Sequence, residues 1–283
     1  MMKSLGEVLT LSAEFLKTKQ SPRPRRIAEE LIGDVLQIKR LDLYLHFDRP
    51  MEEEELRQIR ALLKRASLGE PVEYILGQHS FYNCQLNLNP HVLIPRPETE
   101  ILADQICSLL KKETLEGKTA WDLCTGSGCL GIAIKKRFPQ LHVVLADISK
   151  NALAVASENA KRNGMEVEVL EGDLLAPFSG RKADLIFCNP PYISLNEYFN
   201  LDPSVRDFEP KGALVGGEDG LDFYRRLNKE LPRHLERGAK LFLEIGALQA
   251  EPLLSLFSEP HWKNVRVERD WAGHNRFFFL EIE

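Results

Sequence analysis

Strands and helices alternate through the middle of this 283-residue chain, and that alternation constrains the fold more than any other feature. Apolar runs that suit buried strands occur at residues 120–123, 141–146, 167–170 and 183–188, with helical segments after the first two. Strands that alternate with helices are typical of a parallel sheet with crossover connections. The sequence therefore predicts an α/β fold with a doubly wound, mostly parallel sheet.

The two ends of the chain follow different patterns. Residues 265–267 and 277–282 read as strands with only a short segment between them, so the sheet is expected to end in a C-terminal antiparallel hairpin. The first 76 residues carry apolar positions at helical spacing. We expect a small N-terminal helical domain for substrate docking at 1–76, a β-hairpin linker at 77–97 and a catalytic domain at 98–283.

A glycine-rich turn follows the first of these strands. Gly126 and Gly128 allow the backbone to turn tightly and a ligand to approach it closely. Asp122 precedes them, where a carboxylate would repel a pyrophosphate, and no Gly-Lys-Ser/Thr run follows, which excludes a P-loop. The candidate cofactor-binding residues here are Asp122, Cys124, Thr125, Gly126, Ser127 and Gly128.

Acidic residues end the next two strands. Asp147 lies about 20 residues beyond the glycine turn, where a carboxylate can accept hydrogen bonds from both ribose hydroxyls. Asp173, followed by Leu174, is placed to accept from an adenine amine. A ribose-binding acid and an adenine-side acid without a phosphate cradle favour S-adenosylmethionine over NAD. No metal site is expected.

The strand at 183–188 ends in Asn189-Pro190-Pro191-Tyr192. The two prolines stop the strand because neither can donate to a sheet ladder. The loop lies at a strand's carboxyl end, where open α/β sheets bind ligands. Asn189 and a backbone carbonyl can accept the two hydrogens of a planar NH2 group, and Tyr192 can stack on its plane. We expect these four residues to bind the substrate, with Asn189 also beside the cofactor.

With these motifs the chain resembles the class I S-adenosylmethionine-dependent methyltransferases that modify an amino or amide nitrogen. Two further stretches, IPRPETE at residues 94–100 and FEPKGAL at 208–214, resemble the HemK/PrmC family of protein-glutamine N5-methyltransferases. The resemblance covers nearly the whole chain. One departure is Cys124, which occupies a position where the family often has glycine.

The resemblance implies that the chain methylates the glutamine of a Gly-Gly-Gln motif in peptide chain release factors and produces S-adenosylhomocysteine. Asn189, Pro190 and Tyr192 would then be the catalytic residues. An adenine or guanine N-methyltransferase of nucleic acid is the alternative, since the same four residues could hold a flipped base. A net charge of −5 argues against stable nucleic-acid binding. A binding module that only retains the fold is a third interpretation.

Global properties fit a cytoplasmic enzyme. We find no signal-peptide pattern and no apolar run that approaches the length of a membrane span. Five scattered cysteines predict free thiols, and the seven histidines form no recognisable constellation. We expect a monomer. Two features stay open: the cluster Arg23, Arg25 and Arg26 is either solvated or a contact for RNA or an acidic partner, and Glu244 either lines the pocket or is an exposed strand end.

Overall fold

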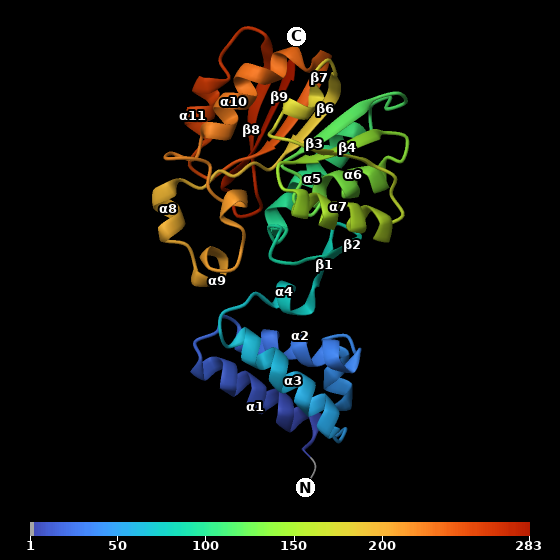
Figure 1. Cartoon of the computed structure of the whole chain (residues 1–283), viewed down its shortest axis with the longest axis vertical. Coiled ribbons are helices and arrows are strands. Elements are labelled where there is room, and N and C mark those ends of the chain that lie inside the picture. The colour runs from blue at the N-terminus through green and yellow to red at the C-terminus, as the bar shows by residue number, and fades with distance from the viewer. Residues whose placement is uncertain (1–2) are drawn as a thin grey trace. The chain divides into compact units, whose positions relative to one another are not determined.

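The computed structural model describes residues 3–283 and divides the chain into two compact units. One unit runs to Gln78 and also contains Asp202–Phe208. The other comprises His79–Leu201 and Glu209–Glu283. Figure 1 colours both units along the chain. A seven-residue segment from the second half of the sequence therefore belongs to the helical unit.

The first unit is helical. Its elements are α1 (Leu5–Thr18), α2 (Pro24–Leu36), the 3-10 helix η1 (Asp42–His46), α3 (Glu53–Ala66), α4 (Val72–Leu76) and α9 (Pro203–Arg206). A capping box begins α1, because Ser4 Oγ accepts from the Glu7 backbone N–H and the Glu7 carboxylate accepts from the Ser4 N–H. Leucine and isoleucine side chains from α1, α2 and α3 form its core.

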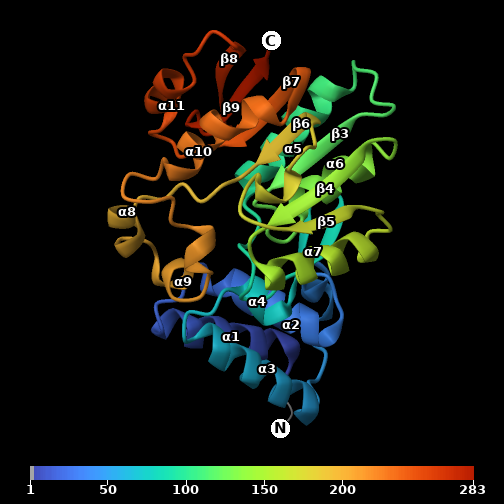
Figure 2. The same cartoon turned by 45° about the horizontal axis from the view of Figure 1, so that its top comes forward.

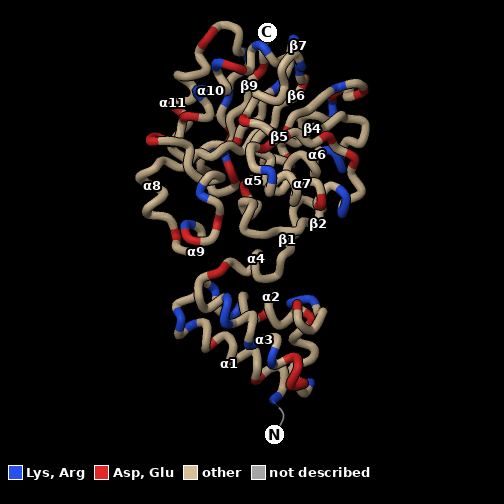
Figure 3. Tube along the Cα trace, viewed as in Figure 1, with Lys and Arg blue, Asp and Glu red and all other residues tan. Residues whose placement is uncertain are grey.

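Most arginine side chains of the first unit pair with carboxylates of the same unit. Arg25 and Arg40 lie 3.1 Å and 2.8 Å from the carboxylate of the buried Glu29. Arg26 pairs with Glu30 at 2.8 Å, one turn along α2. Figure 3 shows basic and acidic positions mixed along this part of the chain. Two of the three clustered arginines are thus held by carboxylates of their own helix.

A two-stranded sheet of β1 (Gln78–Phe81) and β2 (Cys84–Asn87) lies at the start of the second unit, with Gln78 at the boundary. Its main sheet has seven strands in the order β5-β4-β3-β6-β7-β9-β8. These are β3 (Thr119–Leu123), β4 (His142–Asp147), β5 (Glu168–Glu171), β6 (Ala183–Cys188), β7 (Leu235–Glu244), β8 (Trp262–Arg269) and β9 (Asn275–Ile282). The first five are parallel, and β9 pairs antiparallel with both β7 and β8.

Helices cover both faces of this sheet. One group is α5 (Pro97–Leu110), α6 (Cys129–Arg137) and α7 (Lys150–Arg162), and the other is α10 (Asp222–Glu230) and α11 (Ala250–Leu256), as Figures 1 and 2 show. Short helices complete the connections: η2 (Ala176–Phe178), α8 (Leu195–Phe199), η3 (Lys211–Ala213) and η4 (Leu231–Arg233). The expected fold class, a mostly parallel doubly wound sheet with a C-terminal antiparallel hairpin and an N-terminal helical region, is confirmed.

The topology places the site. Chain order reverses between β3 and β6, which are neighbours in the sheet, so the connections after them leave toward opposite faces. A crevice therefore opens at the carboxyl ends of these strands. The glycine turn and the Asn-Pro-Pro-Tyr loop leave these two ends side by side, since Leu123 pairs with Cys188. Across residues 3–283, no helix combines the length and the apolar character that crossing a bilayer demands.

Candidate functional site

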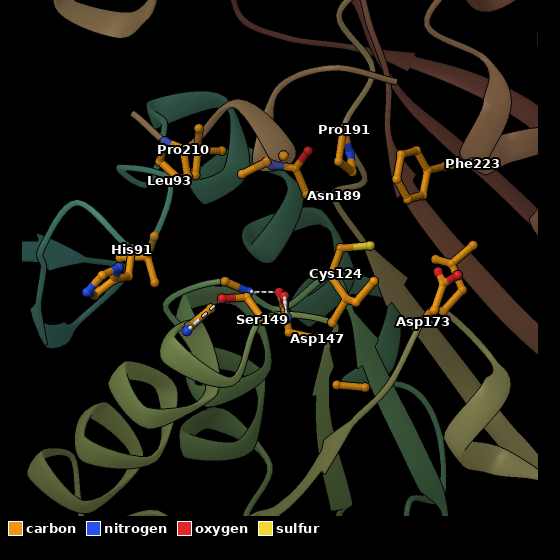
Figure 4. A pocket seen from close by; sticks show the side chains of 18 of the residues that line it. His91, Leu93, Cys124, Asp147, Ser149, Asp173, Asn189, Pro191, Pro210 and Phe223 are labelled. Carbon is orange, nitrogen blue, oxygen red and sulfur yellow. Dashed lines mark hydrogen bonds between the residues drawn. The ribbon is translucent and has the colours of Figure 1, made fainter. Parts of the chain in front are cut away.

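A cavity of about 270 Å³ opens at the carboxyl edge of the sheet. Figure 4 shows Asn189 and Pro191 at one end of it, with Asp147 and Ser149 opposite. Asp173 and Phe223 lie on one side, and His91, Leu93 and Pro210 on the other. Its lining is mostly apolar, and it comes from residues 91–93, Cys124, Gly126, Ala146–Ser149, Ala152, Gly172–Leu174, Asn189, Pro191, Pro210, Gly212, Ala213 and Phe223.

The glycine turn exposes its backbone to this cavity. Gly126 has a φ of 54°, and a Cβ placed on it would meet nothing within 4 Å. Cys124, on the same wall, also has a left-handed φ of 54°, a conformation that costs a side chain with a Cβ about 1 kcal/mol. The position where the resembled family often has glycine therefore adopts a backbone conformation that favours glycine.

The rest of the turn faces away from the cavity. The Asp122 carboxylate is buried, accepts from Thr125 Oγ1 at 2.6 Å and from the Gly131 backbone N–H at 2.9 Å, and is held behind the turn. Burial raises the pKa of Asp122 to about 7. Gly128 begins α6 and packs closely, since a Cβ there would lie 2.7 Å from Ile132 Cδ1. Ser127 is also buried behind the turn. These predicted residues shape the loop without lining the cavity.

The two acidic strand ends differ in their surroundings. Asp147 accepts from the backbone N–H groups of Gly126 and Ser149, both at 2.9 Å, and burial raises the pKa of its carboxyl. Asp173 is half-exposed and pairs with the Arg226 guanidinium at 2.8 Å. Each carboxylate has two oxygens and about four lone-pair sites, so further hydroxyl or amine donors can be accommodated.

The Asn-Pro-Pro-Tyr loop divides between the cavity and the core. Asn189 and Pro191 line the cavity, whereas Pro190 and Tyr192 are absent from its lining. The Tyr192 hydroxyl donates to the Glu244 carboxylate at 3.3 Å, and burial raises the pKa of that tyrosine. The sequence left undecided whether Glu244 lines the pocket or is an exposed strand end. Its side chain is 1% exposed, so this strand end is buried next to the loop.

Sequence reasoning did not assign several residues to the cavity wall. His91, Leu93 and Pro210 come from or beside the two stretches that were noted for their resemblance. Glu209 joins these stretches: its buried carboxylate accepts from the Ile94 N–H at 3.1 Å and from Arg96 Nη2 at 2.6 Å. The IPRPETE and FEPKGAL motifs were therefore the signal for this wall.

Phe223 was missed for a different reason. It projects from α10 to the side of the cavity shown in Figure 4. A lone aromatic residue on an amphipathic helix carries no mark that separates a pocket wall from the core.

Known proteins match this chain over nearly its full length. A family model described as the PrmC N-terminal domain matches residues 7–77, and one described as the methyltransferase small domain matches residues 99–200. A release factor glutamine methyltransferase of Chlamydia trachomatis is 42% identical over 98% of this chain and 94% of that protein. Another, from Geobacter sulfurreducens, is 36% identical over 96% and 95%. The chain belongs to the release factor glutamine methyltransferase family.

A solved structure agrees with the fold of this family member. The 16S rRNA N2 G1207 methyltransferase of T. thermophilus, solved with AdoMet and guanosine, is 17% identical and covers 73% of this chain and 50% of that one, with a TM-score of 0.52. At this identity the likeness concerns the fold alone, and the site has to be tested on its own residues.

The residues that line the cavity of this methyltransferase family member fit S-adenosylmethionine by their chemistry. Its backbone is open at Gly126, where a Cβ would point into empty space. Acceptors for hydroxyl and amine groups, Asp147 and Asp173, lie at separate positions on its wall, and the remaining surface is mostly apolar. No Lys or Arg side chain is among the lining residues, which matches a ligand without phosphates.

Proposed function

We propose that this chain transfers a methyl group from S-adenosylmethionine to the side-chain amide nitrogen of a glutamine in peptide chain release factors. The observation that carries the proposal is the match, over nearly the whole chain, to proteins whose names state this activity. The site is consistent with it, because Asn189 and Pro191 lie at one end of a cavity that has the acidic residues of a nucleoside site at its other walls.

Cofactor binding would involve the turn and the acidic strand ends. Asp147 would accept from the ribose hydroxyls, and Asp173 would accept from the adenine amine. The backbone near Gly126, together with Leu174 next to Asp173, would contact the rest of the cofactor. When bound, S-adenosylmethionine supplies an electrophilic methyl group on its sulfonium. Asp122, Thr125, Ser127 and Gly128 would contribute indirectly by fixing the turn.

The amide nitrogen that accepts the methyl group is a poor nucleophile. The lone pair of an amide nitrogen is delocalised into its carbonyl group. Asn189 Oδ1 and the Pro190 carbonyl would accept the two amide hydrogens, orient the nitrogen toward the methyl group and favour the positive charge that develops on it. The Tyr192 ring, which is outside the lining of the cavity in this structure, is proposed to pack on the amide plane beside the loop and exclude water. After transfer the extra proton can leave to solvent, so no base is required.

The N-terminal helical unit is proposed to dock the protein substrate. A single glutamine side chain offers little binding energy, so contacts far from the reacting atom are needed to hold the target loop. Basic and acidic positions are mixed along this unit, as Figure 3 shows, and several form exposed ion pairs, which suits a protein partner better than a polyanion. We further propose that the enzyme acts as a monomer in the cytoplasm, where release factors work.

The experiment is intact-mass analysis of release factors after incubation with the enzyme and S-adenosylmethionine. One added methyl group is expected on a native release factor, and none on a variant with the Gly-Gly-Gln glutamine replaced by alanine. Duplex and single-stranded oligonucleotides are assayed in parallel. Methylation of nucleic acid with no mass change in the release factor would overturn the proposal in favour of a base N-methyltransferase.

A further inference from the structure

A chain of three hydrogen bonds joins the end of β7 to the Asn-Pro-Pro-Tyr loop through helix α5. Thr99 Oγ1 donates to Glu244 Oε2 at 2.7 Å. Asn189 Nδ2 donates to the same Thr99 oxygen at 3.5 Å. The Tyr192 hydroxyl donates to the second carboxylate oxygen of Glu244 at 3.3 Å. The Glu244 carboxylate is thus linked to both polar side chains of the loop, directly to Tyr192 and through Thr99 to Asn189.

The direction of each hydrogen bond in this network follows from the Glu244 carboxylate at its end. A carboxylate only accepts hydrogen bonds, so Thr99 must use its single hydroxyl hydrogen toward Glu244. Its oxygen can then only accept from Asn189, which must present its NH2 group to Thr99. The other half of the Asn189 amide, Oδ1, is left for the cavity that this residue lines. An asparagine without such a neighbour can flip and present either half.

Thr99 and Glu244 are both shielded from water. Thr99 is 2% exposed and Glu244 is 1% exposed, so water does not compete for either group. The backbone carbonyl of Glu244 also accepts from the Tyr224 hydroxyl at 2.7 Å, which fixes the strand end from the opposite side. Neither Thr99 nor Glu244 is among the residues that line the cavity. Both therefore act on the reaction through the loop.

We propose that Thr99 and Glu244 are positioning residues that hold the Asn189 amide with its oxygen toward the substrate. The inference rests on the proposed function, because it assigns Asn189 Oδ1 as the acceptor for an NH2 hydrogen of the target glutamine. With the amide reversed, two NH2 groups would face one another and the glutamine would lose its acceptor. The same bond network explains why the IPRPETE stretch, which supplies Thr99, accompanies the Asn-Pro-Pro-Tyr loop.

The test compares single and double variants of the full-length enzyme. Thr99→Val keeps the shape and removes the hydroxyl, and we expect kcat to fall by about tenfold or more, the effect of losing 1.4 kcal/mol of transition-state stabilisation. S-adenosylmethionine affinity, measured by calorimetry, should stay within a factor of about two. Thr99→Ser keeps the hydroxyl and should recover most of the activity. Thr119→Val, in the same unit on β3, is the matched control and should leave kcat unchanged.

A double-variant cycle separates positioning from packing. If Thr99 acts through Asn189, adding Thr99→Val to Asn189→Ala should lower kcat no further than Asn189→Ala does alone. Multiplicative losses, or wild-type kcat in Thr99→Val, would overturn the positioning role. The proposed function is judged separately, by whether the wild-type enzyme adds a methyl group to the release factor at all.

Discussion

Glu209 and Arg96 form an ion pair at 2.6 Å that joins two segments 113 residues apart at the cavity wall. The Glu209 carboxylate is almost fully buried and the Arg96 side chain is 30% exposed. The same carboxylate accepts from the Ile94 N–H at 3.1 Å. This pair ties the loop that carries His91 and Leu93 to the loop that carries Pro210.

Breaking this pair should destabilise the fold and weaken cofactor binding. Arg96→Ala removes the guanidinium from a buried carboxylate, at a cost of roughly 2 kcal/mol after allowing for the partial exposure of Arg96. Urea denaturation and S-adenosylmethionine calorimetry measure both effects. The control is Arg57→Ala, which breaks an exposed pair with Glu54 and should change neither quantity. Equal effects of the two substitutions would contradict the role given to Glu209.

Asp147 should matter most for cofactor affinity. Asp147→Ala removes the proposed ribose acceptor and also frees the N–H groups of Gly126 and Ser149, which the carboxylate now holds. We expect S-adenosylmethionine binding to weaken by tenfold or more, roughly 1.4 kcal/mol. Calorimetry decides the outcome, with Asp147→Asn as a variant that keeps one acceptor oxygen. Binding of NAD in place of S-adenosylmethionine would end the interpretation of this cavity.

Asn189 should matter for turnover more than for cofactor affinity. Asn189→Ala removes an acceptor that is used most strongly when charge develops on the amide nitrogen. A fall in kcat of about a hundredfold or more is expected, the scale of one lost transition-state hydrogen bond. Single-turnover kinetics at saturating S-adenosylmethionine measure the chemical step. Near-normal turnover would remove Asn189 from the mechanism.

The stability of the enzyme should depend on pH through Glu244. The pKa of this carboxyl is raised to about 6 from 4.5, because burial and, to a smaller extent, Glu98 outweigh the opposite effect of the Thr99 and Tyr192 hydroxyls and Arg276. Between these two pKa values the folded state binds more protons than the unfolded chain. The contribution of Glu244 to folding therefore becomes less favourable as pH rises from about 4.5 to about 6.

Glu244→Gln cannot titrate and isolates this contribution. The unfolding free energy of the wild type, relative to that of Glu244→Gln, should fall by about 2 kcal/mol as pH rises from about 4.5 to 7. Other groups titrate in the same range, among them Asp122 with its pKa of about 7, but they cancel in the difference. Urea denaturation at several pH values measures it. A difference that stays constant with pH would show that folding leaves the pKa of Glu244 unshifted.

The docking role of the helical unit predicts a change in KM alone. A groove of about 160 Å³ on this unit is lined by Lys3, Val8, Leu11, Ser12, Phe15, Leu56, Ile59, Arg60 and Leu63. Leu11 is 47% exposed, and Leu11→Ser should raise the KM for an intact release factor by about fivefold, roughly 1 kcal/mol. Affinity for S-adenosylmethionine should not change.

The matched control is Leu45→Ser, at a 79% exposed apolar residue on η1 of the same unit. It should leave the KM for the release factor unchanged. An unaltered KM in Leu11→Ser would exclude this groove as a contact, and equal increases in both variants would indicate a general effect of the unit on substrate binding.

The main sheet could be predicted from sequence because its signals are local. The parallel strands β3, β4, β5 and β6 each contain a short apolar run, with a glycine, an acid or a proline pair at or just after its carboxyl end, whereas β7 is longer and carries charged residues in its first half. Parallel strands place their carboxyl ends on one edge, so residues such as Gly126, Asp147 and Asn189 had to gather there. The terminal hairpin followed from the short connection between β8 and β9.

The sequence by itself therefore determined the fold class, the edge that holds the cavity and seven of the nineteen residues on its wall. Only the tertiary structure decided which way the polar groups point. Asp122 is turned behind the glycine turn, Glu244 is turned inward under the loop, and Glu209 reaches across to Arg96. These outcomes depend on partners from 3 to 145 residues away, and a one-dimensional pattern cannot show which donor a carboxylate will meet once the chain has folded around it.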